Sequence, residues 1–173
     1  MEFLEKDLEQ IIYETPDEKL EQKNLYTRGR RFRQLRIGNY GIADMITVQR
    51  YKTDPMYESQ RTYNCLEITV YELKKDKIGI SAFLQAVRYV KGISKYLENR
   101  HSGLFLSYRI VLIGRTIDDS GSFLYLPDVF CNPSHGCVPS GGIESVELFT
   151  YSYGVDGLNF KEHSGYQLVN QGF

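Results

Sequence analysis

The sequence predicts an α/β fold, a mixed β-sheet with helices packed on its faces. Residues 1–15 and 80–100 have the apolar periodicity of amphipathic helices, and the runs between them are rich in β-branched and aromatic residues. The almost wholly apolar run at 108–116 is typical of a strand buried on both faces. The 173 residues suit a single domain, with a core at 1–116 and a β-rich extension at 117–173.

The first helix is expected from apolar residues that recur every three or four positions, the spacing of one helical face. These residues are Phe3, Leu4, Leu8, Ile11 and Ile12. Pro16 ends the helix, because the residue before a proline is driven out of the helical region. Glu5 and Glu9 lie one turn apart beside the apolar face, and helix phase does not choose between them.

Three strands are expected to follow. Residues 31–37 and 42–51 flank the turn sequence Asn-Tyr-Gly, and residues 65–75 come after a polar connection, 52–64, that contains a proline. We expect the second and third strands to pair as an antiparallel hairpin with this connection at its tip. The helix at 80–100 then carries the chain to 108–116, a strand that can return parallel to the third one.

The last third differs from the core in its turns. Strands are expected at 122–130, 146–154 and 157–163, with a loop rich in proline and glycine at 131–145. Cys131, His135 and Cys137 in that loop invite comparison with a zinc site. Structural zinc takes four ligands, and a fourth is not evident here, so we do not expect zinc.

The overall charge excludes little. There are 21 basic and 22 acidic side chains, but five of the basic ones lie within nine residues: Arg28, Arg30, Arg31, Arg33 and Arg36. Such a segment suits a phosphate-facing patch and equally suits a solvated strand. Three cysteines, no secretory signal and no apolar run near the roughly 20 residues that span a bilayer predict a cytoplasmic protein with reduced thiols and no membrane association.

Three charged residues stand where the predicted hairpin begins and ends. Asp44 lies among apolar neighbours in the second strand, while Glu72 and Lys74, two apart near the end of the third strand, share a face. An exposed ion pair would explain the last two alone. If the strands pair, however, Asp44 approaches Glu72, and two carboxylates with water suit Mg²⁺ or Mn²⁺. A lysine beside such a metal suits phosphodiester hydrolysis.

Five short motifs occur in a particular order. They are KDLEQII with Glu9, RFRQLR with Arg33 and Gln34, YGIADMITV with Asp44, VYELKKDKIG with Glu72 and Lys74, and AFLQAVRYV with Gln85 and Tyr89. This order resembles the PD-(D/E)XK nuclease superfamily, in particular the nuclease domain of mismatch-repair endonucleases and their small relatives. The resemblance covers about residues 1–115.

The resemblance implies a restriction-endonuclease-like fold and a Mg²⁺- or Mn²⁺-dependent endonuclease, with DNA expected in preference to RNA. It implies that Asp44, Glu72 and Glu9 bind the metal, that Lys74 positions the attacking water, and that Gln85 supports the site. Substrate contacts or support are expected from Arg31, Arg33, Gln34 and Tyr89. A homodimer that cuts both strands is compatible with this picture.

The chain also departs from the family pattern. Ala43 stands where the superfamily's name has a proline, the connection between Asp44 and Glu72 is long, and no separate DNA-binding domain is evident. We therefore do not carry over mismatch specificity. The alternative is a non-catalytic module on the same fold that binds nucleic acid or a protein partner, for example in defence or counter-defence.

Overall fold

The computed structural model describes residues 4–52, 62, 64–98, 104–118, 120–130 and 142–163. The elements in the N-terminal part are α1 (Glu5–Glu14), α2 (Asp17–Gln22), β1 (Arg30–Arg36), the 3₁₀ turn η1 (Gly38–Tyr40), β2 (Ile42–Lys52), β3 (Asn64–Leu73), β4 (Lys77–Ile78) and α3 (Ile80–Leu97). The remainder forms β5 (Phe105–Gly114), β6 (Thr116–Ile117), η2 (Ser120–Tyr125), α4 (Leu126–Phe130), β7 (Ile143–Gly154) and β8 (Gly157–His163).

The main sheet has six strands in the order β1-β2-β3-β5-β7-β8. Strands β3, β5 and β7 run parallel, whereas β1, β2 and β8 pair antiparallel with their neighbours. This confirms the predicted α/β class, the β2–β3 hairpin, the parallel return of β5 and the β-rich C-terminal extension. The short strands β4 and β6 form a separate parallel pair.

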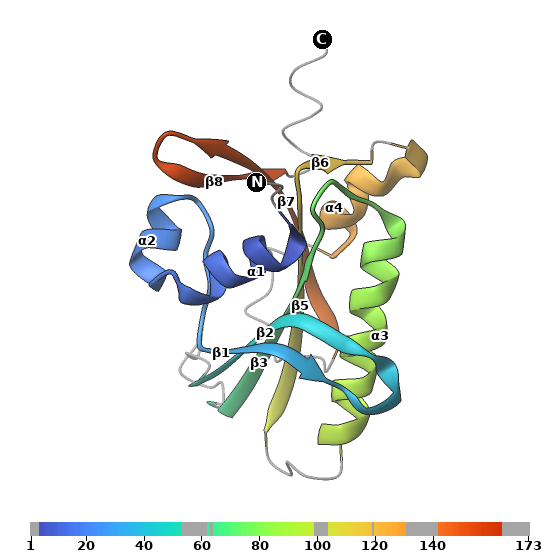
Figure 1. The fold of residues 1–173 in the computed structure, drawn as a ribbon. Helices are drawn as coiled ribbons and strands as arrows, with labels where there is room; N and C mark the ends of the chain where they lie inside the picture. Colours follow the sequence, from blue (N-terminus) through green and yellow to red (C-terminus); the bar gives the residue numbers. More distant parts are fainter. Residues whose placement is uncertain are drawn as a thin grey trace.

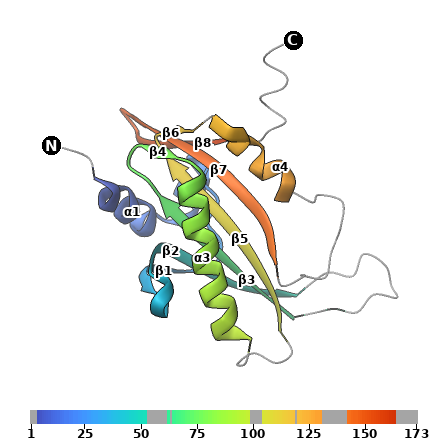
Figure 2. The same ribbon diagram turned by 90° about the vertical axis from the view of Figure 1, so that its right-hand side faces the viewer.

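Helices cover both faces of the sheet, α3 on one side and α1 with α2 on the other (Figures 1 and 2). The alternation of side chains along β3 explains the two apolar layers. Ile68 and Val70 belong to the cluster that α3 covers, and Tyr71 and Leu73 to the cluster that contains Leu8 of α1. No helix among the described residues is long and apolar enough to cross a membrane.

The prediction of a strand at 122–130 was wrong. These residues lie in η2 and α4. The run is rich in apolar and aromatic residues, as a strand would be, but Pro127 has no N–H for a sheet ladder and fits the first turn of a helix. Phe130 then packs against Phe83 of α3, with the ring centroids 5.9 Å apart.

Several observed element boundaries also differ from the predicted ones. The third strand ends at Leu73 rather than at 75, and α2 was not predicted, since six residues are too few to show a helical period. Strand β7 begins at Ile143, three residues before the predicted start. Cys131, His135 and Cys137 lie outside the described residues.

Candidate active site

Strands β2 and β3 stop pairing where the predicted carboxylates stand. The ladder runs from Lys52↔Asn64 to Met45↔Tyr71 and goes no further. Beyond the end of the ladder, a side chain replaces the backbone as acceptor: Asp44 Oδ2 accepts a hydrogen bond of 2.9 Å from the backbone N–H of Leu73. The structure thus brings Asp44 beside the end of β3, as the sequence predicted.

Glu72 is the most deeply buried acid of this group, with no exposed surface. Its Oε1 accepts a hydrogen bond of 2.6 Å from Lys74 Nζ, whose side chain is 27% exposed. Its Oε2 is buried and has no hydrogen-bond partner among the described residues. An unpaired buried carboxylate oxygen is costly in a native fold and points to a partner such as a cation.

The first turn of α1 reaches the same corner. Glu5 Oε1 lies 3.7 Å from Lys74 Nζ, and Glu5 Oε2 accepts a hydrogen bond of 3.2 Å from the Lys75 N–H. The motif pattern favoured Glu9 over Glu5, so sequence reasoning missed this contact. The signal was the one-turn spacing of the two acids, which places both on the flank of α1 that meets β3.

Glu9 is buried, at 3% exposed, and it is held from β1. Arg33 Nε lies 2.6 Å from Glu9 Oε1, and Gln34 Nε2 donates a hydrogen bond to Glu9 Oε2. The Arg33 contact is an ion pair and not a directed hydrogen bond, because Glu9 Oε1 has no hydrogen-bond partner of acceptable geometry.

Two adjacent residues of a regular strand point to opposite faces, so Arg33 and Gln34 would not both reach Glu9. Gln34 resolves this by adopting the left-handed backbone conformation, with φ of 50°. The β1–β2 ladder accordingly passes from Arg33↔Met45 to Leu35↔Ala43 without a Gln34 pair. A strained residue at such a point indicates a position that the surrounding structure fixes.

Burial raises the pKa of both central carboxyl groups. The pKa of Asp44 rises to about 6, because burial outweighs the Leu73 hydrogen bond and the charge of Lys74. The pKa of Glu72 rises to about 7 through burial and repulsion from Asp44, against the opposing effect of Lys74. The pKa of Lys74 is also raised: burial opposes this, but the Glu72 hydrogen bond and the surrounding acids prevail. The carboxyl groups of Asp44, Glu72 and Glu5 therefore outnumber the one ammonium group, that of Lys74, at this corner.

This donor set fits a metal of limited protein ligation. Among the described residues, no three carboxylate, imidazole or thiol groups gather closely enough to hold an ion by themselves. Mg²⁺ and Mn²⁺ take hard oxygen ligands, and Mg²⁺ keeps several waters beside one or two carboxylates. Asp44 and the unpaired Oε2 of Glu72 suit that pattern, while Glu9 is engaged with β1, so its contact with a metal, directly or through water, stays a prediction.

Gln85 and Tyr89, which were also expected in the site, contact each other on α3. Gln85 Nε2 donates a hydrogen bond of 2.8 Å to the hydroxyl of Tyr89 on its own helix, and no described hydrogen bond joins it to the carboxylates. Tyr89 is buried, at 2% exposed. Arg88, which is exposed, places its Cζ 5.7 Å from that ring centroid and offers a cation to the surface instead.

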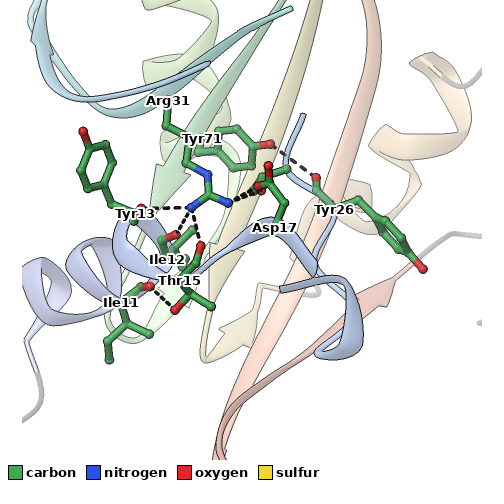
Figure 3. Close-up of polar contacts among 9 residues, drawn as sticks. Ile11, Ile12, Tyr13, Thr15, Asp17, Tyr26, Arg31 and Tyr71 are labelled. Atoms are coloured by element: carbon green, nitrogen blue, oxygen red, sulfur yellow. Dashed lines mark hydrogen bonds and ion pairs between the residues drawn. The ribbon is translucent and has the colours of Figure 1, made fainter. Parts of the chain in front are cut away.

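Arg31, expected to contact substrate, ties α1 to the sheet (Figure 3). Its Nη1 donates hydrogen bonds to the carbonyls of Ile12 and Tyr13, both at 3.0 Å, and of Thr15 at 2.6 Å. Its Nη2 donates to the carboxylate of Asp17. Ile12 and Tyr13 lie in the last turn of α1 and Thr15 is its C-cap, where carbonyls lack partners within the helix, so Arg31 caps this C-terminal end.

Searches of family models, curated proteins and solved structures found no significant match to this chain.

Proposed function

We propose that this chain is a metal-dependent endonuclease that hydrolyses phosphodiester bonds, with DNA expected in preference to RNA. The observation that carries the proposal is the buried Oε2 of Glu72, which has no hydrogen-bond partner among the described residues. The nearby carboxyl group of Asp44 has a raised pKa. The buried Glu72 and the half-buried Asp44 have only one lysine, Lys74, to offset their charge. Such perturbed pairs cluster at functional sites.

Bound Mg²⁺ or Mn²⁺ supplies an activated water and offsets charge that develops on the phosphate. Asp44 and Glu72 would hold the ion, and the Leu73 N–H fixes the orientation of Asp44. Lys74, whose Nζ lies 2.6 Å from Glu72 Oε1, would orient the attacking water and stabilise the charge that develops on the phosphate. Glu5 keeps Lys74 in this corner through its 3.7 Å contact.

The exposed arginines of β1 are the candidates for contacts with substrate phosphates. Arg30, Arg33 and Arg36 are exposed on this edge strand, whereas Arg31 is committed to α1. Arg33 contacts a predicted site residue, because it pairs with Glu9. Exposed arginines contact phosphates without reading sequence, so this edge supports affinity for the backbone and not base specificity.

A cleavage assay on supercoiled plasmid, linear duplex, single-stranded DNA and RNA tests the proposal, with Mg²⁺, Mn²⁺ or EDTA in parallel. We expect cleavage that requires metal and disappears in Asp44→Asn and Lys74→Gln. The exposed α3 lysine variant Lys91→Gln, which alters charge away from the carboxylates, keeps wild-type cleavage. Metal-independent products, or equal rates in Asp44→Asn and wild type, would refute the site. Absence of both cleavage and metal binding by calorimetry would favour the non-catalytic binding module.

A further inference from the structure

A groove lies on the α3 side of the sheet, between the β1–β2 hairpin and the C-terminal half of α3. Its volume is about 840 Å³. The floor comes from Ile46 and Val48 of β2 and from Leu66 and Ile68 of β3. The walls come from β1, η1 and the last turns of α3.

Gly92 sets how the helix meets the end of this groove. A Cβ at Gly92 would lie 2.7 Å from Ile37 Cγ2 and from Tyr40 Cδ2, so glycine lets Ile37 and η1 pack directly on α3. At the rim, Leu35 is 39% and Tyr96 is 59% exposed. Exposed apolar side chains around a concave apolar surface are typical of a binding site.

The charged side chains that line the groove, among the residues that the structure describes, all have one sign. They are Arg36, Arg50 and Lys95, and no described aspartate or glutamate lines it. This is notable in a chain with 21 basic and 22 acidic side chains. Long basic side chains can lie along apolar surface while their cationic ends face water and an incoming anion.

We propose that this groove binds an amphipathic organic anion, a molecule with an unbranched hydrocarbon chain and one anionic head group, as in a fatty acid. The volume lies within the roughly 300–1,000 Å³ of small-molecule pockets. The apolar floor excludes water from a hydrocarbon chain but offers few partners to a polar ring such as a nucleobase, which would lose its hydrogen bonds there. The cationic rim selects an anionic head. The proposal is independent of the nuclease activity.

Calorimetric titration with dodecanoate, below the concentration at which it forms micelles, tests this directly. We expect saturable binding by the wild-type chain, and binding at least about tenfold weaker for butanoate, which lacks the chain, and for methyl dodecanoate, which lacks the charge. Equal affinity for dodecanoate and its methyl ester, or no binding of dodecanoate, overturns the proposal.

Variants locate the binding. Leu35→Trp places a large side chain at the mouth of the groove and should abolish dodecanoate binding. Leu84→Trp, at a more exposed leucine of α3 that does not line the groove, should not. The double variant Arg50→Gln/Lys95→Gln should weaken binding about tenfold, the loss expected for a charged hydrogen bond, and Lys91→Gln should have no effect. Circular dichroism confirms that each variant is folded. Unchanged affinity in both groove variants places the ligand elsewhere and refutes the proposal.

Free fatty acid and membrane lipid share this chemistry. Sedimentation with phosphatidylglycerol vesicles separates the two sources. A groove that takes up a single hydrocarbon chain should bind monomeric dodecanoate, and the protein should not sediment with the vesicles. Strong vesicle binding that persists in Leu35→Trp would assign the affinity to a charged surface and overturn the groove.

Discussion

Lys74 Nζ lies 2.6 Å from one oxygen of Glu72, while the other oxygen of the same buried carboxylate has no hydrogen-bond partner. Lys74 therefore provides a partner for only one of the two carboxylate oxygens of Glu72. Asp44, anchored by the Leu73 N–H, adds a second negative charge beside it. Burial of this arrangement costs stability, a cost that proteins commonly accept at functional sites.

The metal-free protein should become less stable as the pH rises through this pair's titration range. The carboxyl pKa values of Asp44 and Glu72 are raised from 3.8 to about 6 and from 4.5 to about 7, so the unfolded chain releases these protons first. Stability from this pair is thus fully present below about pH 4 and is lost by about pH 7. Glu72→Gln removes one buried charge and should raise the melting temperature in EDTA near pH 8 by several degrees, about 1–3 kcal/mol.

Thermal unfolding of wild type and Glu72→Gln across this pH range, both in EDTA, makes the comparison. Glu21→Gln, an exposed carboxylate on α2, is the matched control and should follow wild type. Parallel curves for wild type and Glu72→Gln would contradict the assigned burial of this charge.

Mn²⁺ should stabilise the folded chain by binding the two acids. At a free concentration near 100 times the dissociation constant, the gain is about 2.7 kcal/mol. Protons compete for the same oxygens, so the gain should shrink as the pH falls through the pKa values of about 7 and about 6. Differential scanning fluorimetry measures it. An equal gain in Asp44→Asn would show that the metal binds elsewhere.

Gln34→Gly should separate stability from activity. Glycine adopts the left-handed conformation freely, so it relieves about 1 kcal/mol of strain and offsets the lost hydrogen bond to Glu9, of about the same size. The free energy of unfolding should change by less than about 1 kcal/mol, whereas cleavage should fall about tenfold, as expected for a group that orients the site. Gln34→Asn, whose amide is shorter, should behave likewise. Unchanged cleavage in both variants would remove Gln34 from the site.

Arg31→Ala should destabilise the fold by about 2–4 kcal/mol, because it removes the donor to two carbonyls of α1 and to that of its C-cap, Thr15, and leaves Asp17 without its ion pair. Urea unfolding measures the loss. The prediction fails if Arg31→Ala keeps wild-type stability and weakens substrate binding alone, which is the behaviour of a residue that contacts only substrate.

The sequence predicted the meeting of Asp44 and Glu72 because strand alternation and hairpin pairing are both local consequences of the residue pattern. It did not predict the left-handed Gln34, since glutamine carries no signal for that conformation. The choice between Glu5 and Glu9 depended on where β3 ends, a tertiary matter. The apolar groove beside α3 arises from the approach of two distant segments at Gly92, which no periodicity reveals.

Residue composition alone led to the wrong prediction of a strand at 122–130, where the structure has helical turns. Leu124, Tyr125 and Leu126 favour sheet or helix about equally in so short a run, and Pro127 decided the outcome. By contrast, the long amphipathic pattern of α3 gave a helix that begins at the predicted residue, Ile80.

The rate of phosphodiester cleavage by Glu72→Gln, measured beside wild type with Mn²⁺ on the nucleic acids of the substrate panel, tests the central claim most directly. The account predicts that wild type and Glu21→Gln cut at least one of these substrates and that Glu72→Gln, although more stable in EDTA, cuts none of them. Cleavage by Glu72→Gln at the wild-type rate, or no cleavage by wild type with Mn²⁺, would contradict it.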